Sequence, residues 1–403
     1  MSNVPDIRFK GFTDAWEQRE LGEVVQLING KAFKQNELLD DGKYRVLRVG
    51  NFNTNNQWYY SNLELPKDKY IDKGDLVYLW ATTFGPEFWN EEKVIYHYHI
   101  WKVNIIDKNL DKNYLYSWMK YDKNKILNNT NGSTMIHITK ENMDSRKIKF
   151  PNIEEQIKIG QIFGEIDRTI TLLQRELDLE NKTIEMFMDN LFIQKEQNIP
   201  CFNLSENTSL WKSVKLKEIG DTFTGLSGKN KDDFGHGDAW YITYMNVFSN
   251  PISNFNDKEK IEIDFKQNEV KYGDIFFTTS SETPNEVGMS SVWLGDDANI
   301  YLNSFCFGFR PKVELDPYFI AYLLRSKEVR MKISKLAQGI SRYNISKTKM
   351  MEIEINIPDI KTQNEVGRIL KELHEKKQIT EKQIEKAKII KKAFLQKLFP
   401  KGD

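Results

Sequence analysis

The chain has 403 residues, and its 58 Lys and Arg residues balance 58 Asp and Glu residues. This length predicts two or three domains, and a hydrophobic fraction of 39% is enough for packed cores. The two cysteines, Cys201 and Cys306, exclude a disulfide framework and a zinc cluster, and they indicate a reducing cytoplasm. Because no run approaches about 18 apolar residues and no signal peptide is recognised, we expect no membrane segment.

Residues 1–150 are predicted to form a mixed unit of strands and helices. Runs of β-branched and apolar residues at 24–28 and 76–79 indicate short strands, and residues 148–150 indicate a last strand. Aromatic and apolar residues at 114–119 indicate a short helix. This mixture favours an α+β unit with a substantial curved sheet.

Residues 151–199 are predicted to form a long helix. Pro151 stands just before it, where proline is tolerated, and Pro200 ends it. A helix of about 40 residues is about 60 Å long. Apolar residues recur at alternating spacings of four and three, as in a coiled coil, and Glu180 interrupts them. The predicted seam contains Phe163, Ile166, Ile170, Leu173, Leu177, Glu180 and Phe187.

Residues 200–356 are predicted to form a second α+β unit, which follows a polar linker at 195–209. Its expected elements are strands at 275–278, 305–309 and 353–355 and a helix at 318–324. Residues 357–403 are predicted to form a second long helix after Pro358. Its seam has three polar breaks and contains Leu370, Leu373, Lys377, Ile384 and Phe394.

The two halves of the chain repeat each other. From Pro151 and Pro358 to Phe192 and Phe399 the matching positions keep a constant offset of 207 residues, and near the start of each α+β unit the offset is 195. Such self-similarity predicts two similar units, each followed by a similar helix, in a pseudo-two-fold symmetric molecule. Duplication kept only for stability is the alternative.

The helices carry opposite charge. Residues 151–200 have five basic and ten acidic side chains, whereas residues 357–403 have twelve basic and seven acidic side chains. We therefore expect the two helices to pair with each other as an antiparallel coiled coil. If their ends align, Glu180 should lie within a turn of Lys377.

Motifs that support catalysis are missing from the sequence. It has no phosphate-binding G-x-x-x-x-G-K-[ST] loop, no G-x-G-x-x-G, and no Asn/Asp-Pro-Pro-aromatic tetrapeptide of aminomethyltransferases. Residues 225–229 have the wrong spacing for such a loop and indicate a turn. His97 and His99 could share one strand face as metal ligands, but structural histidines are the better interpretation. We expect a chain that is not an enzyme and binds no metal.

Short motifs resemble the DNA specificity (S) subunits of type I restriction–modification enzymes. Residues 4–12, 14–17 and 21–24 are similar to the amino terminus of that family. Residues 138–140 leading to 151–156 resemble its junction between target recognition domain and spacer helix. The second junction departs slightly, with Thr362-Gln363 where Glu-Gln is usual. The resemblance covers nearly the whole chain, in the order recognition domain, spacer, recognition domain, spacer.

The resemblance implies that residues 1–150 and 200–356 are target recognition domains, each reading half of a split double-stranded DNA site. It implies docking of two modification (methyltransferase) subunits, and of restriction (translocase and nuclease) subunits. No cofactor is expected on this chain, because S-adenosylmethionine, ATP and Mg belong to the partner subunits. Two other classes stay open: a coiled-coil adaptor that binds only proteins, and a degenerate stand-alone methyltransferase or nuclease.

The segments just before the long helices are basic in both repeats. Residues 102–149 carry a net charge of +5 and residues 310–349 carry +7, as a local DNA footprint would. Predicted phosphate contacts are Lys140, Arg146, Lys147, Arg342, Lys347 and Lys349. Further candidates, for base reading, are Arg48, Asn51, Thr82, Thr83, Asn246 and Tyr343.

Overall fold

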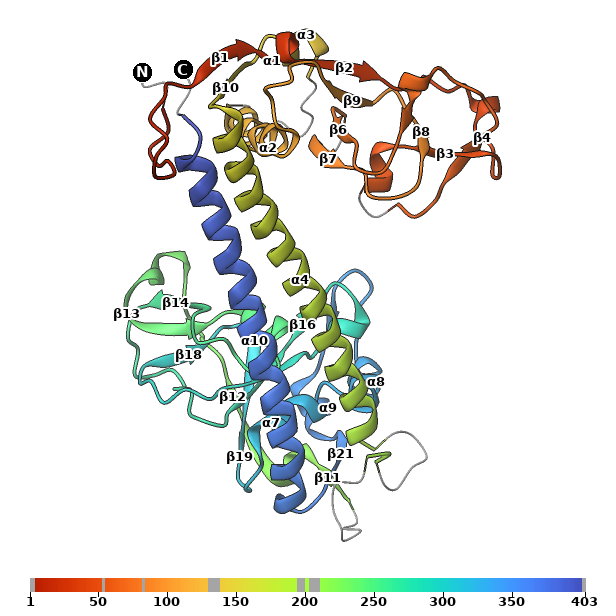
Figure 1. Ribbon diagram of the computed structural model, residues 1–403. Coiled ribbons are helices and arrows are strands. Elements are labelled where there is room, and N and C mark those ends of the chain that lie inside the picture. Colours follow the sequence, from red (N-terminus) through yellow and green to blue (C-terminus); the bar gives the residue numbers. More distant parts are fainter. Residues whose placement is uncertain are drawn as a thin grey trace. The chain divides into compact units, whose positions relative to one another are not determined.

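The computed structural model describes residues 4–52, 55–81, 84–129, 138–193, 200–202 and 211–400. The chain forms two compact units, the first comprising residues 1–174 with 382–403 and the second residues 175–381. Two long helices, α4 (Ile153–Leu191) and α10 (Ile360–Lys397), contribute one half to each unit. Within each unit the α4 and α10 segments run side by side (Figure 1).

The first unit is a mixture of short strands and helices, as the sequence predicts. Its strands are β1 (Glu17–Glu20), β2 (Val25–Asn29), β3 (Tyr44–Leu47), β4 (Tyr59–Ser61), β5 (Tyr70–Ile71), β6 (Leu76–Leu79), β7 (Gly85–Phe88), β8 (Val94–Tyr96), β9 (Ile100–Ile105) and β10 (Lys147–Phe150). Its shorter helices are α1 (Leu21–Val24), α2 (Lys112–Asn129) and α3 (Lys140–Asp144), with 3-10 turns η1 (Gln35–Glu37), η2 (Val49–Phe52) and η3 (Lys67–Lys69).

The main sheet of the first unit has the order β2-β9-β6-β7 and is antiparallel. All four residues of β6 are buried, which explains why its sequence is a continuous apolar run rather than an alternating one. A second sheet has the order β4-β3-β8-β5, in which β3 and β8 are parallel. The strand pair β1-β10 leads into α4.

The core of the first unit joins the main sheet to helices. On α2, Tyr114, Leu115, Trp118 and Met119 are buried, and their spacing forms one helical face. Leu395, Leu398 and Phe399 of the chain's last residues belong to the same apolar cluster. The ring of Phe399 stacks on Phe163 of α4 with centroids 5.8 Å apart, so this helix end is anchored in the unit's core.

The second unit repeats this plan. Its strands are β11 (Lys212–Lys215), β12 (Gly220–Thr224), β13 (Phe234–Ile242), β14 (Lys258–Ile261), β15 (Ile275–Thr278), β16 (Ser280–Ser281), β17 (Ser290–Val292), β18 (Ile300–Leu302), β19 (Cys306–Pro311), β20 (Tyr343–Asn344) and β21 (Glu354–Ile357). Its shorter helices are α5 (Leu216–Ile219), α6 (Tyr244–Ser249), α7 (Pro317–Leu323), α8 (Lys327–Ser334) and α9 (Lys347–Met351), with 3-10 turns η4 (Lys231–Asp233) and η5 (Pro284–Glu286).

Sheet topology confirms the duplication. The main sheet of the second unit has the order β12-β19-β15-β17, which matches β2-β9-β6-β7 strand for strand. The parallel pair β13-β18 matches β3-β8, and β11-β21 matches β1-β10. Helix α7 begins with Pro317 after Asp316, whose carboxylate accepts the Phe319 N–H at 2.7 Å. The predicted α+β fold class with two long helices is confirmed.

The main helices and strands expected from the sequence are present. The helices expected at 151–199 and 357–403 are α4 and α10, and the strands expected at 76–79 and 275–278 are β6 and β15. Most of the linker expected at 195–209 lies outside the described residues. Among the helices that the structure describes, none is both long and apolar enough to span a membrane.

Candidate DNA interface

One turn has the same backbone geometry in both units. In the first unit it joins β8 to β9 through residues 97–99, and in the second it joins β18 to β19 through residues 303–305. The Trp80 N–H donates to the carbonyl of His99 at 3.3 Å, and the Thr279 N–H donates to the carbonyl of Phe305 at 3.0 Å. These bonds tie each turn to the end of the neighbouring central strand.

A glycine lies against each of these turns. A Cβ atom on Gly30 would collide with the carbonyl oxygens of Tyr96 and His97, and one on Gly225 would collide with the carbonyl oxygen of Asn303. The two glycines are 195 residues apart, which is the offset of the repeat. Glycine therefore permits the same close approach of backbone in both units.

The side chains on the two turns differ. The first turn carries His97, Tyr98 and His99, and the second carries Asn303, Ser304 and Phe305. His97 stacks on the Phe33 ring with centroids 6.4 Å apart, and burial is the main reason why its pKa falls to about 4. Its imidazole is therefore neutral at pH 7. Among the described residues no group of three or more His, Cys, Asp or Glu side chains could hold a metal ion.

In the second unit, a hairpin at residues 338–344 lies beside this turn. Gln338 and Asn344 exchange backbone hydrogen bonds of 3.0 and 2.8 Å at its base. The Arg342 guanidinium donates from Nε and Nη2 to the hydroxyl of Ser280 at 3.3 and 3.1 Å, and it lies 6.0 Å from the centre of the Phe305 ring. Tyr343 is half-buried and pairs with Ser281 between β20 and β16.

Four predicted lysines are exposed near the two junctions, and two of them, Lys140 and Lys347, are at matching positions on α3 and α9. Lys140 starts α3 and Lys147 starts β10 in the first unit, while Lys347 and Lys349 lie on α9 in the second. A hydroxyl group caps the start of both short helices. The Thr139 hydroxyl accepts the Asn142 N–H at 3.2 Å, and the Ser346 hydroxyl accepts the Lys349 N–H at 3.4 Å. The same local signal therefore positions basic residues at each junction.

Arg146 is placed differently from these lysines. Its guanidinium forms an ion pair with the carboxylate of Asp122, which is buried on α2. Burial raises the pKa of Asp122, and the hydrogen bond from Arg146 opposes that rise. Breaking this pair would leave a buried charge, so Arg146 holds α2 to the junction. A phosphate contact by Arg146 remains a prediction, and the guanidinium would have to make it while paired with Asp122.

Asn51 and Asn246 occupy matching positions and perform matching structural roles. The Asn51 amide donates to the carbonyls of Asn55 and Gln57 at 3.1 and 3.0 Å. The Asn246 amide donates to the carbonyls of Asn254 and Asp257, both at 2.8 Å, and Asn246 is fully buried. A buried amide whose donors are both used cannot reach a base edge. The prediction of base reading by Asn246 is therefore wrong, and Asn51 organises a loop.

Of the three further base-reading candidates Arg48, Thr82 and Thr83, the structure describes Arg48. Arg48 is half-buried, lies 4.2 Å from the centre of the Tyr59 ring, and donates to the carbonyl of Gln57 at 3.1 Å. Thr82 and Thr83 lie outside the described residues.

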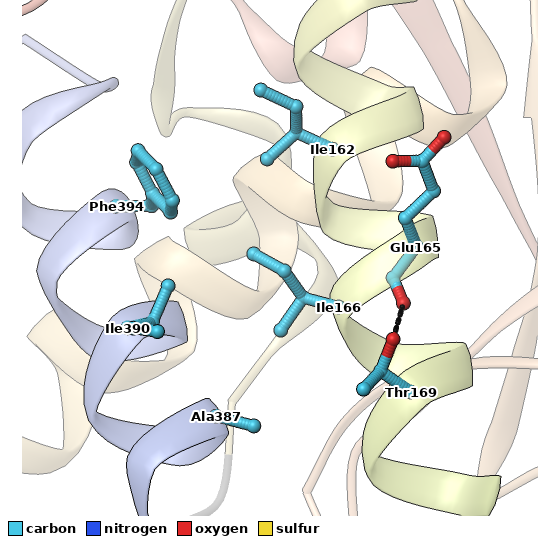
Figure 2. A pocket seen from close by; sticks show the side chains of 7 residues that line it. All are labelled: Ile162, Glu165, Ile166, Thr169, Ala387, Ile390 and Phe394. Carbon is cyan, nitrogen blue, oxygen red and sulfur yellow. Dashed lines mark hydrogen bonds between the residues drawn. The ribbon is translucent and has the colours of Figure 1, made fainter.

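The helix segments of the first unit form a groove. It measures about 360 Å³ and lies between α4 and α10. Figure 2 shows apolar side chains from both helices pointing toward one another, with Glu165 and Thr169 on the α4 side. The remaining lining residues are Ile162, Ile166, Ala387, Ile390 and Phe394. An ion pair between Lys391 and Asp167 also joins the two helices. Phe163 contacts Phe399 and Asp167 contacts Lys391, so residue numbers rise along one segment as they fall along the other, and the two segments are antiparallel.

The predicted seam residues divide between the two units. Phe163 and Phe394 belong to the core of the first unit, and Ile166 lines the groove. Leu370 is buried in the core of the second unit, with Phe187 and Leu373 packed against it, and Ile384 is buried in the first unit. Ile170, Leu173 and Leu177 are half-buried, whereas the polar seam residue Glu180 is buried.

Sequence reasoning missed the residues that shape the loop cluster of the second unit. These are Ser280, Phe305, Ile340 and Gly225, and Gly30 is the matching glycine of the first unit. The glycines could have been found, because they share the repeat's offset of 195. Phe305 was instead placed at the start of a strand, and Ile340 has no local pattern that separates it from a core isoleucine.

Comparisons with known proteins agree on one family. Residues 13–181 and 208–388 match the family described as type I restriction modification DNA specificity domain. The specificity subunit of the type I restriction enzyme MjaVIII from Methanocaldococcus jannaschii is 25% identical over 389 residues, covering 93% of this chain and 90% of the relative. The specificity subunit of the type I restriction enzyme EcoBI from Escherichia coli is 19% identical, and the match covers 93% of this chain and 82% of that relative.

Solved structures share the fold. The S subunit of a type I restriction–modification system from M. genitalium has a TM-score of 0.64 at 16% identity, covering 99% of this chain and all of that chain. A chain from a study of complex assembly and conformational transition of the type I R-M system has a TM-score of 0.54 at 15% identity. The match covers 97% of this chain and 99% of that chain. The family match covers both repeats and more than half of the residues of this chain. The chain therefore belongs to the type I restriction modification DNA specificity domain family.

Proposed function

We propose that this chain is the specificity subunit of a type I restriction–modification enzyme and that each unit reads one half of a bipartite, asymmetric DNA site. One observation carries the proposal. The turns at 97–99 and 303–305 keep the same backbone bonds but carry different side chains. Side chains read the base edges of DNA, so two turns with the same backbone but different polar and aromatic side chains suit two half-sites of different sequence.

The exposed lysines at the two junctions supply the sequence-independent part of binding. Lys140 and Lys147 in the first unit, and Lys347 and Lys349 in the second, are proposed to contact phosphates. Contacts of this kind release counterions, so each one lost should lower the salt dependence of DNA binding by about one unit of slope. Lys→Gln changes at these positions should weaken binding to all sequences equally.

The chain is proposed to catalyse no reaction itself and to bind modification and restriction subunits, which carry S-adenosylmethionine, ATP and Mg. The apolar groove of the first unit supports a docking role for the helices (Figure 2). A groove lined by Ile162, Ile166 and Ile390 would bury apolar surface against an incoming helix. Purified chain without partners should transfer no methyl group to DNA.

Mapping methylated adenines in cells that carry this chain with its partner subunits tests the proposal. The expected result is one motif made of two specified parts separated by an unspecified gap. Cells that have the modification subunits but lack this chain are the control and should show no such motif. A continuous motif, or no motif in either culture, would contradict the proposal and favour a protein-binding adaptor.

A further inference from the structure

We infer that the hairpin at 338–344 reads bases in the half-site of the second unit, with Arg342 donating to a base edge and Ile340 contacting bases in the groove. This inference rests on the proposed DNA-binding function. It replaces the expectation that Arg342 contacts a phosphate, and it assigns roles to Ile340, Phe305 and Ser280.

The hairpin is fixed at its base. Backbone hydrogen bonds of 3.0 and 2.8 Å link Gln338 and Asn344, and Asn344 also pairs with Ser280 between β20 and β16. Gly339 has a φ of 138°, and a Cβ atom there would collide with the carbonyl oxygen of Arg342. Only glycine permits this tight crossing of backbone. The tip therefore projects from a framework that leaves it little conformational freedom.

Arg342 is oriented by groups that are themselves held. Ser280, which accepts from its guanidinium, is 4% exposed, and the Ser280 carbonyl accepts the Tyr244 hydroxyl at 2.6 Å. A pre-oriented guanidinium loses less entropy when it binds than a free side chain does. Phosphate contact needs no such preorganisation, because a flexible lysine suffices. Geometric control of this kind instead suits a planar donor fork aimed at a base edge.

Phe305 is also preorganised. Its carbonyl accepts hydrogen bonds from the Thr279 N–H at 3.0 Å and the Thr279 hydroxyl at 2.9 Å, and its own N–H donates to the Asn303 side chain at 2.8 Å. Despite these three bonds the ring is 56% exposed, and it faces Arg342. Such constraint on an exposed aromatic side chain serves contact with a partner better than it serves packing.

Ile340 gives the hairpin an apolar tip. It is 95% exposed, so it contributes almost nothing to the core of the second unit. Ile340 lies two residues before Arg342 in the hairpin, and the Phe305 ring lies 6.0 Å from the Arg342 guanidinium. A row of phosphates offers no partner for apolar side chains, whereas the grooves of DNA offer thymine methyl groups and base faces. The combination of a fixed cation and apolar neighbours therefore matches the groove rather than the backbone of DNA.

Two variants test the inference in the complex with its modification subunits, after the wild-type motif has been mapped. Arg342→Lys keeps the charge but removes the planar fork. Ile340→Ser changes only the exposed tip. Binding is measured on cognate DNA and on DNA altered in the half-site that the second unit reads. Lys312→Gln is the control, because Lys312 belongs to the same basic segment but follows the far end of β19 and pairs with Asp221.

We expect Arg342→Lys to reduce discrimination between cognate and altered DNA by about 5- to 150-fold and to relax the methylated motif in one half only. Ile340→Ser should reduce discrimination in the same half with an unchanged melting temperature. Lys312→Gln should change neither. If both variants keep wild-type discrimination while the bipartite motif persists, the inference fails and the proposed function stands. Absence of a bipartite motif in the wild type would instead contradict the proposed function.

Discussion

The carboxylate of Glu180 accepts a hydrogen bond from the hydroxyl of Thr380 at 3.1 Å, between α4 and α10 within the second unit. Both residues are buried. The Lys376 ammonium lies 3.4 Å from the same carboxylate, whereas Lys377 pairs with Glu381 on its own helix at 3.9 Å. Glu180 therefore lies within a turn of Lys377, as expected from the sequence, but its partners are Lys376 and Thr380 rather than Lys377 itself.

This polar pair gives the first prediction. Thr380→Val should lower the free energy of unfolding by about 1–3 kcal/mol, because it leaves a buried carboxylate without its hydroxyl donor. The double change Glu180→Leu with Thr380→Val should restore stability, since a well-packed apolar pair avoids the burial of charge. Urea denaturation of the four members of the cycle measures both effects. Lys376→Met, at an exposed ammonium, should cost about 1 kcal/mol or less. If the effects of Glu180→Leu and Thr380→Val on the free energy of unfolding are additive, the predicted interaction between Glu180 and Thr380 is contradicted.

The second prediction concerns pH and His374. Burial lowers the pKa of His374 to about 4, and its Nδ1 lies 2.9 Å from the Tyr322 hydroxyl. The unfolded chain binds a proton near pH 6.5, so the folded state is disfavoured as the pH falls from about 6.5 towards 4. The contribution of neutral His374 to the free energy of unfolding is fully present above pH 6.5. The free energy of unfolding should therefore decrease by about 1–3 kcal/mol more in the wild type than in His374→Phe across this window. Parallel pH profiles of the two proteins would refute this.

Arg325 provides the third prediction. Its guanidinium donates to the carbonyls of Ser290, Val247, Phe248 and Asn250 at 2.7–3.0 Å, so it joins the ends of α6 and β17. Arg325→Lys should destabilise the second unit by at least about 2 kcal/mol, because one ammonium cannot satisfy four carbonyls in this planar arrangement. Thermal unfolding measures the loss. Arg368→Lys, at an exposed ion pair on α10, is the matched control and should have little effect.

The fourth prediction separates structural from recognition roles. Asn246→Ala should reduce stability by about 2–3 kcal/mol, since the carbonyls of Asn254 and Asp257 lose their donors. The methylated motif should stay the same in cells in which the variant still folds. Asn256→Ala, whose side chain is exposed, should change stability by less than about 0.5 kcal/mol. An altered motif with unchanged stability would restore Asn246 as a base reader.

Elements with strong local patterns could be predicted from the sequence. The heptads and flanking prolines predicted α4 and α10, and the apolar runs predicted β6 and β15. The β4-β3-β8-β5 sheet was not predicted, because its strands have two to four residues and Val46 pairs with Ile95 far along the chain. Local pattern carries no information about such pairings.

The candidate interface was predictable only as a region. The repeat and the basic segments located the junctions, and the exposed lysines lie there. The sequence could not show that Arg146 meets Asp122, 24 positions away, or that Asn246 is buried. Ile340 and Ile345 lie in one segment, yet the first is 95% exposed and the second is buried. Only tertiary contacts distinguish residues of the same type at this spacing.

The central claim, that each unit reads its own half-site, is tested most directly by replacing residues 1–150 with the matching domain of a relative that modifies a different motif. The replacement ends at Phe150, before α4, and its new core must still pack against Phe163 and Phe399. Methylated adenines are then mapped with the same partner subunits present. The account predicts that one half of the motif changes while the other half stays the same. A motif changed in both halves, or in neither, would contradict it.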